Sequence, residues 1–565
     1  MQRDSWNLVR AELNTMKLKI IKVHPADNVL VALADLQAGE EVVYQHDRYK
    51  IIELIPAKHK FVIADIAQGG EIIMYGVLVG KAQSHIPVGG LLSTGNVVHA
   101  ANSFLTGSSH TDWHKPDVSK WQNQTFNGYH REDGNVGTAN YWLVIPMVFC
   151  ENRNIEVLQE ALVKPLGYGR KKTYEIKAQQ LINKIKAGGS IDEVLYTEIE
   201  GDTARSSGDK LFPNVDGIKF LSHTGGCGGT RQDSTTLCGL LAGYITHPNV
   251  AGATVLSLGC QNAEVKTLQE EISKRSPNFN KPLYILDQQK TGKEADLLEQ
   301  AIRQTLAGLM QANTYTRLPS PISKLVIGLE CGGSDGFSGI SANPAIGYTS
   351  DLLVALGGSV ILAEFPELCG VEQNLIDRCL DKDKAERFAS LVSSYSQRAE
   401  EAGSGFYMNP SPGNIKDGLI TDAIKSAGAA KKGGTSPVAD VLDYPEKVTR
   451  PGLNLLCTPG NDVESTTAEV GSGANVVLFT TGLGTPTGNP IAPVVKIATN
   501  TTLFNRMSDI IDINTGTIVE GDETIEQAGE RILDYVIKVA SGEVEVCAVR
   551  HGQDDFIPWK RGVSL

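Results

Sequence analysis

The sequence lacks the long apolar segments that membrane proteins and secreted precursors carry. Its 565 residues contain no uninterrupted apolar run of about 18 residues, the length that a transmembrane helix needs. The first residues, from Met1 to Trp6, also lack the apolar core of a secretory signal. We therefore expect a cytoplasmic protein that has no membrane partner.

An excess of basic residues is also absent. The chain has 52 lysines and arginines against 65 aspartates and glutamates, which gives a formal net charge of −13. Nucleic acids are bound by concentrated positive charge, so we expect no nucleic-acid partner. An acidic protein can still contain a locally positive pocket, so the net charge does not exclude a small anionic substrate.

Cysteine pairs of the CxxC type are missing. The nine cysteines are odd in number and widely spaced, which excludes a disulfide framework of the kind found in small secreted domains. Most free cysteines are small buried residues. Only the local sequence around each cysteine can therefore indicate a ligand.

The length of the chain and its changing pattern predict three domains, because 565 residues exceed what one hydrophobic core accommodates. Residues 17–105 contain short apolar runs separated by glycine and proline, which indicates a small β-rich domain. Buried strands then alternate with amphipathic helices, which favours α/β architecture with largely parallel sheets. We place the second domain at 122–315 and the third at 316–565.

Three predicted strands are followed by a cysteine beside glycine: Cys227, Cys260 and Cys331. Ligands of parallel sheets bind at the carboxyl ends of strands, so these thiols are candidate metal ligands. Three thiolates can hold an iron–sulfur cluster with one open iron, whereas a single Fe²⁺ or Mn²⁺ prefers oxygen and nitrogen donors. The spacing does not choose between these sites. The alternative is three small residues packed under glycine turns.

Carboxylates near the same strand ends are candidates for general acid–base chemistry. Glu330 ends an apolar strand, Asp335 follows it in a glycine-rich turn, and Asp462 follows Asn461 in a later turn. The alternative for Asp335 and Asn461 is helix capping, which is common. His223 is a candidate base because Cys227 follows it four residues later.

Anion-binding residues are less distinctive. No glycine-rich run matches the GxxxxGK[ST] phosphate loop, so a nucleotide site has weak support. Lys496 follows an apolar strand and can pair with a substrate carboxylate, although a surface lysine is the alternative. His99, in the N-terminal domain, is a further candidate ligand or base.

Several longer motifs resemble those of the altronate/galactarate dehydratase family, with its altronate branch nearer. The matching stretches run from about residue 17 to the end, so the resemblance covers nearly the whole chain. The most specific of them are His24–Val29, Gly328–Gly339, Asn409–Asn414, Pro459–Asp462 and Lys496–Asn500.

This resemblance implies an N-terminal β-clip (SAF-type) domain followed by two α/β domains. It implies loss of water from a sugar acid to give a 2-keto-3-deoxy acid, by an enzyme that depends on iron or manganese. On that basis Glu330 or His223 would be the base, assisted by Asp335 and Asp462. Substrate would be bound by Lys496, Asn461 and Asn102. The metal ligands would be Cys227, Cys260, Cys331 and His99.

Two positions depart from the family pattern. The β-clip domain of the family carries alternating histidines before an asparagine, but here Val97, His99 and Ala101 precede Asn102, so only the middle histidine remains. An arginine that usually follows Gly-Thr is Ala139. The exact sugar acid is therefore less determined than the reaction class.

Two alternatives to this function stay open. The same scaffold can release another group, such as sulfite from a sulfolactate-type acid. The missing histidines also allow a protein that binds a sugar acid without catalysis. Self-association into a homo-oligomer is left open by the sequence.

Overall fold

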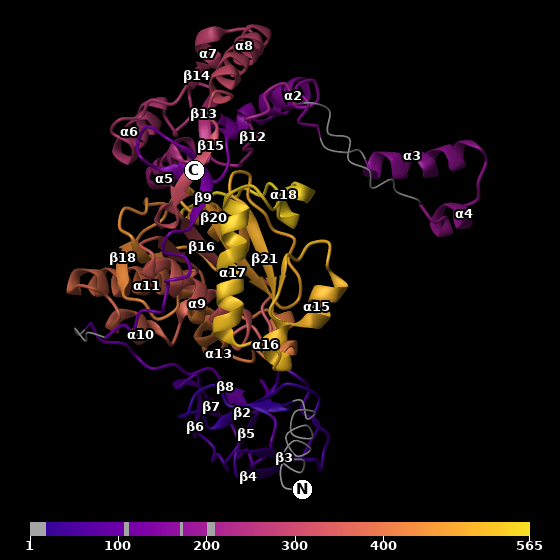
Figure 1. The fold of residues 1–565 in the computed structure, drawn as a ribbon, viewed down its shortest axis with the longest axis vertical. Helices are drawn as coiled ribbons and strands as arrows, with labels where there is room; N and C mark the ends of the chain where they lie inside the picture. Colours follow the sequence, from indigo (N-terminus) through magenta and orange to yellow (C-terminus); the bar gives the residue numbers. More distant parts are fainter. Residues whose placement is uncertain (1–17, 107–111, 170–172, 200–209) are drawn as a thin grey trace.

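The computed structural model describes residues 18–106, 112–169, 173–199 and 210–565. Three bodies follow one another along the long axis of the molecule (Figure 1). The N-terminal β domain lies at one end, the domain with the largest sheet lies in the middle, and the second domain lies at the opposite end. In the described part of the chain, no helix is both long and apolar enough to cross a membrane.

The N-terminal domain consists of three small antiparallel sheets, ordered β1-β2-β5, β3-β4 and β6-β7-β8. Its core side chains, such as Leu30 and Phe61, are fully buried. The glycine turns at Gly39 and Gly69 have φ values of 83° and 80°, which side chains rarely adopt. The strands are β1 (Ile20–Ile21), β2 (Val29–Ala32), β3 (Glu41–Tyr44), β4 (Asp47–Lys50), β5 (Lys60–Val62), β6 (Glu71–Met74), β7 (Val77–Ala82) and β8 (Val97–Val98).

The second domain contains a four-stranded parallel sheet in the order β12-β11-β13-β14. Every residue of its two central strands, β11 and β13, is buried, as expected for a parallel sheet covered on both faces. The strands are β11 (Tyr141–Pro146), β12 (Gly217–Phe220), β13 (Val250–Ser257) and β14 (Leu283–Asp287). A small antiparallel sheet joins β9 (Thr125–His130) to β10 (Val136–Gly137) and β15 (Arg317–Pro321).

Helices of the second domain follow its strands in sequence. They are η1 (Phe149–Glu151), α2 (Asn152–Leu162), α3 (Thr173–Lys186), α4 (Ile191–Tyr196), α5 (Arg231–Thr246), α6 (Val265–Arg275), α7 (Gln288–Thr291) and α8 (Glu294–Ala312). Helix α8 packs on β13, and α2 packs on β11. This alternation of strand and helix produces the parallel sheet that the sequence predicts.

The C-terminal domain is built on a seven-stranded parallel sheet in the order β18-β19-β17-β16-β20-β21-β22. The strands are β16 (Val326–Cys331), β17 (Ser359–Leu362), β18 (Val438–Leu442), β19 (Gly452–Leu456), β20 (Val476–Thr481), β21 (Val494–Ala498) and β22 (Ile513–Asn514). Because all seven are parallel, their carboxyl ends share one edge. The predicted class, α/β with largely parallel sheets after a β-rich domain, is confirmed.

Helices and short 3₁₀ turns cover this sheet. Helix α9 packs against α17, and it also contacts β17 and β20. The elements are η2 (Ile322–Lys324), α9 (Ala342–Ala355), η3 (Phe365–Leu368), α10 (Glu372–Asp377), α11 (Lys382–Glu401), η4 (Phe406–Met408), α12 (Pro412–Lys416), α13 (Asp422–Ala429), η5 (Ala430–Gly433), α14 (Asp462–Gly471), α15 (Thr501–Arg506), α16 (Gly516–Glu520), α17 (Ile525–Ala540) and α18 (Cys547–His551).

Candidate active site

A buried group of ionisable side chains lies at the carboxyl edge of the C-terminal sheet. Strand β16 ends at Cys331, and the neighbouring strand β17 is followed by Glu364 and Glu367. The Cys331 Sγ lies 3.5 Å from Glu364 Oε2 and 3.2 Å from Glu367 Oε2. These three form the one set, within the described residues, whose potential metal-ligand atoms all lie within 4.8 Å of one another.

Two lysines bring positive charge to this group. Lys432, in η5, places Nζ 2.9 Å from Cys331 Sγ and 2.5 Å from Glu364 Oε2, and both partners are buried. Lys425, in α13, donates to Glu367 Oε1 at 2.6 Å. The charges of the carboxylates are therefore compensated, which a buried charge requires.

The two adjacent buried glutamates differ in protonation. Burial raises the pKa of Glu330 well above its usual range, and the neighbouring carboxyls of Glu364 and Glu469 raise it further. Neither Glu330 oxygen accepts a hydrogen bond from a described donor. Burial also opposes the ionisation of Glu364, but Lys432 outweighs it and lowers the Glu364 pKa. These effects favour the neutral form of Glu330 and the charged form of Glu364, so Glu330 is poorly suited to act as a base.

Asp462 is the carboxylate best matched to proton abstraction near neutral pH. It begins α14 and lies against Gly332, where an added Cβ would come 1.9 Å from Asp462 Oδ2. Burial raises the pKa of Asp462 to about 7, and the charges of Glu364 and Glu367 contribute. A general base works best when its pKa lies near the working pH.

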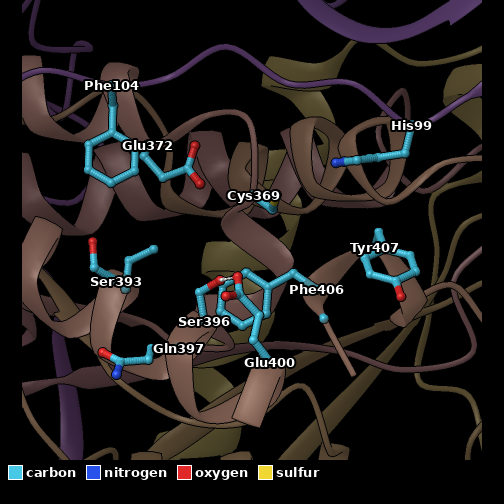
Figure 2. Close-up of a pocket in the computed structure, with 12 residues that line it drawn as sticks. His99, Phe104, Cys369, Glu372, Ser393, Ser396, Gln397, Glu400, Phe406 and Tyr407 are labelled. Atoms are coloured by element: carbon cyan, nitrogen blue, oxygen red, sulfur yellow. Dashed lines mark hydrogen bonds between the residues drawn. The ribbon is translucent and has the colours of Figure 1, made fainter. Parts of the chain in front are cut away.

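A cavity of about 450 Å³ is lined in part by Cys369, two residues beyond Glu367, but by no member of this buried group. The lining also includes His99 and Phe104, from the end of the N-terminal domain. Figure 2 shows the ring of His99 directed toward the cavity, with Tyr407 beneath it. A hexose-sized acid fits such a volume, because small-molecule sites span roughly 300–1,000 Å³.

The family pattern has alternating histidines at the positions of Val97, His99 and Ala101. Of these three residues, only His99 lines this cavity. Its Nδ1 accepts a hydrogen bond of 3.4 Å from the backbone of Ala423, at the start of α13. Burial lowers the pKa of His99, so its imidazole is neutral at pH 7. Asn102 is exposed in the following segment.

Lys496 and Asn461 lie on the same side of the sheet as Asp462. Lys496 is fully buried in β21, its Nζ donates to the Thr487 carbonyl, and it lies 5.0 Å from the centre of the Phe479 ring. Burial lowers the Lys496 pKa to about 8, while negative charges, including that of Asp462, oppose this. Asn461 is exposed and caps α14 by accepting from the Glu464 amide at 3.4 Å.

Asp335 joins the N-terminal domain to the C-terminal sheet. The side chain of Asp335 is fully buried, with Oδ2 3.0 Å from Lys58 Nζ. Its Oδ1 accepts from Thr499 at 2.9 Å and from Ser338 at 3.1 Å. Lys58 is also 2.8 Å from Asp417. These contacts give Asp335 a positioning role at the domain junction.

His223 is held by the backbone of the second domain. Its Nδ1 accepts from the Gly225 amide at 3.1 Å, and its Nε2 lies 2.7 Å from the Pro146 carbonyl. Because Nδ1 accepts, Nε2 must carry the proton and donate it to that carbonyl. Both ring nitrogens are therefore engaged, and burial lowers the His223 pKa. In this geometry neither ring nitrogen of His223 is available to accept a substrate proton.

The three cysteines expected in one pocket are divided between two domains. Cys331 is buried in the C-terminal domain among Glu364, Glu367 and Lys432. Cys227 and Cys260 are exposed in the second domain. The strand ends that carry the three cysteines belong to two different sheets, and the ligand set around Cys331 includes neither Cys227 nor Cys260.

Sequence reasoning missed Glu364, Glu367, Lys425 and Lys432. Glu364 directly follows the strand at Val360–Ala363, so the strand-end rule applied to that strand would have found it. The lysines carry no such signal. They lie in α13 and η5, which only the tertiary fold brings back to β16.

Family models match all three parts of the chain. They are "Altronate/galactarate dehydratase SAF domain" at residues 18–100, "D-galactarate dehydratase/Altronate hydrolase, second domain" at 128–313, and "D-galactarate/Altronate dehydratase, C-terminal" at 322–564. The N-terminal β domain is thus a SAF domain, as the resemblance implied.

Curated relatives match over nearly their full length. The altronate dehydratase of Escherichia coli (strain K12) is 33% identical over 97% of this chain and 100% of its own length. That of Bacillus subtilis (strain 168) is 33% identical over 96% and 99%. The galactarate dehydratase (L-threo-forming) of E. coli (strain K12) is 32% identical over 93% of each chain. The expected class, a carbon–oxygen lyase of the hydro-lyase type, is confirmed at the level of the family. The chain belongs to the altronate/galactarate dehydratase family.

Proposed function

We propose that this protein removes water from altronate or a closely similar hexonate or hexarate, giving a 2-keto-3-deoxy acid. The observation that carries the proposal is the buried group formed by Cys331, Glu364, Glu367 and Lys432, with Asp462 against Gly332, the residue after Cys331. Such a group combines a base with charges that can bind and polarise an acidic substrate.

Asp462 is the base in this proposal. Dehydration requires removal of the proton on the carbon beside the substrate carboxylate. The Asp462 pKa of about 7 leaves a substantial ionised fraction at neutral pH and makes its conjugate acid easy to form. Glu330, which is neutral and fully buried behind Glu364, keeps the charge of the group low.

In this proposal, lysine side chains bind the substrate carboxylate and stabilise the negative charge that develops on it when the proton is removed. The Nζ of Lys496 donates to the Thr487 carbonyl and feels the charge of Asp462. Its pKa of about 8 leaves it mostly charged at pH 7. Lys425 contacts both Glu367 and Asn409, which links the group to the Asn409–Asn414 motif.

The donor set of Cys331, Glu364 and Glu367 fits a divalent metal. The Oε1 of Glu364 is buried and has no hydrogen-bond partner among the described residues, so a ligand atom is available. One sulfur and several oxygens suit Fe²⁺ better than Mn²⁺, because thiolate is a soft ligand. Bound there, the ion would act as a Lewis acid on the substrate carboxylate and the departing hydroxyl.

A substrate panel tests the proposal. Purified protein is incubated anaerobically with Fe²⁺ and with altronate, galactarate, other hexonates and hexarates, and sulfolactate. Formation of a 2-keto-3-deoxy product from a hexonate or hexarate is expected. Sulfite release from sulfolactate alone would support the other leaving group, and binding without turnover would support a sugar-acid-binding protein. Either result would overturn the proposal.

A matched pair of variants tests the base. Asp462→Asn should lower kcat by about 10²-fold or more, the usual contribution of a positioned base, with a small effect on KM. Glu464→Gln removes a carboxylate from the same helical turn and should keep most of the activity. Equal activity of the two variants would exclude Asp462 as the base.

A further inference from the structure

The second domain carries a group of three exposed thiols. Of the nine cysteines, Cys150, Cys227 and Cys260 are exposed, while the other six are buried or intermediate. Free cysteine is among the most buried residue types, so three exposed thiols in one domain are unusual. The proposed dehydration uses none of them.

The sheet topology brings these thiols to one edge. Cys150 lies in η1 after β11, Cys227 lies in the loop after β12, and Cys260 lies in the loop after β13. Strand β11 is hydrogen-bonded to β12 on one side and to β13 on the other, and all three are parallel. The three loops that carry the cysteines therefore leave the same edge of the sheet.

Backbone hydrogen bonds lock the three loops together. The Phe149 amide donates to the Gly225 carbonyl at 3.1 Å, which joins the first loop to the second. The Ala263 amide donates to the Gly226 carbonyl at 3.1 Å, which joins the third loop to the second. Gly226 has a φ of 98°, and a Cβ there would lie 2.1 Å from the Met147 carbonyl oxygen. Only glycine allows this close approach.

The three sulfurs do not converge on one small ion. Among the described residues, only Cys331, Glu364 and Glu367 have ligand atoms that all lie within 4.8 Å of one another, so at least one pair among the sulfurs of Cys150, Cys227 and Cys260 is farther apart.

This spacing distinguishes two kinds of metal site. Around one zinc ion, with Zn–S bonds of about 2.3 Å, tetrahedral thiolates lie roughly 4 Å apart. A cluster binds each thiolate through a different iron, so its ligands lie farther apart. Soft thiolates select iron–sulfur clusters over single hard cations. The wider spacing therefore favours a cluster.

We propose that Cys150, Cys227 and Cys260 bind a [4Fe–4S] cluster whose fourth iron has no cysteine ligand. Each thiol loses its proton to solvent when its sulfur binds iron. The six other cysteines lie in α5 or in the C-terminal domain and do not complete the set. A cavity of about 160 Å³ is lined by Cys227, the glycines around it and Lys560, and it would give small molecules access to an open iron. Water or a small oxyanion completes its coordination there.

Anaerobic reconstitution of the full chain with ferrous iron and sulfide tests this site. About four irons and four acid-labile sulfides per chain are expected, with visible absorption that oxygen bleaches. The triple variant Cys150→Ala/Cys227→Ala/Cys260→Ala should lose the sulfide and the absorption. The control Cys547→Ala, which removes a buried thiol, should keep both.

Further variants separate this site from the proposed active site. Cys331→Ala should keep the labile sulfide, even if it loses turnover or the separate metal. The triple variant could lose the cluster simply by misfolding, so the single variant Cys227→Ser is also tested, after its circular dichroism is shown to be native. This variant should change the spectrum of the reduced cluster. The cluster proposal would be overturned if the triple variant kept its labile sulfide, or if the wild-type protein bound stoichiometric zinc instead. It would also be overturned if the cysteines formed a disulfide that resists reductant and so prevents reconstitution.

Discussion

Replacing Asp462 with asparagine should stabilise the protein while removing its activity. The pKa of Asp462 rises from 3.8 to about 7, mainly because the carboxyl is buried. A pKa that is about three higher corresponds to about 4 kcal/mol of preference for the neutral form. Its place at the start of α14 favours negative charge and offsets roughly 1 kcal/mol of this. The expected net gain for Asp462→Asn is therefore about 3 kcal/mol.

The pH dependence of this gain follows from proton linkage. Between pH 4 and 7 the folded protein holds the Asp462 proton while the unfolded chain has lost it, so wild-type stability falls as the pH rises through this window. The asparagine variant lacks this loss. Its advantage should be complete above about pH 7 and absent below about pH 4.

Thermal unfolding of metal-free protein measures the effect, because a bound cation would lower the Asp462 pKa. At pH 8 the variant should melt roughly 5–10 °C above the wild type, given the size of the C-terminal domain. The difference should vanish near pH 4, and Glu464→Gln should show a smaller shift. A pH-independent difference, or a less stable variant at pH 8, would refute the reasoning.

Three other variants probe buried charges. Lys432→Met should lower the unfolding free energy by about 3–5 kcal/mol, because it leaves Glu364 charged and unpaired. Denaturant titration measures this loss, and the double variant Lys432→Met/Glu364→Gln should recover part of the lost free energy. Glu330→Gln should raise the unfolding free energy at pH 7, because the folded protein favours the protonated form of Glu330 while the unfolded chain has lost that proton, and glutamine avoids this cost; a loss of stability in the same titration would contradict this. Burial lowers the pKa of Lys60 to about 7, so the unfolded chain binds its proton between about pH 7 and 10 while the folded protein does not. Wild-type stability should therefore rise with pH across this window relative to Lys60→Met, by up to about 4 kcal/mol, and parallel melting curves of the two proteins would contradict this.

The fold class was predictable because it depends on local patterns. The apolar runs at β13 and β16 are nearly continuous, which is typical of strands buried on both faces of a parallel sheet. The glycine turns between short strands likewise indicated the N-terminal β domain. Both signals arise from neighbouring residues, so they are legible without knowing how the chain returns on itself.

The charge state of the site was not predictable in this way. Glu330 and Glu364 are both glutamates at strand ends, but Glu330 is neutral and Glu364 is charged, because Lys432 reaches only one of them closely. Lys432 is 101 positions from Cys331 in sequence. A pKa depends on distances across the fold, which sequence spacing does not contain.

The sequence by itself determined which strands end in cysteine, glycine and carboxylate, and hence the family and the strand ends where we propose the chemistry. Only the tertiary structure decided how those ends are grouped. It placed Cys331 with Glu364 and Glu367, and it placed Cys227 and Cys260 beside Cys150, which no motif had singled out. The physical reason is that strand order within a sheet, rather than order along the chain, determines which strand ends are neighbours.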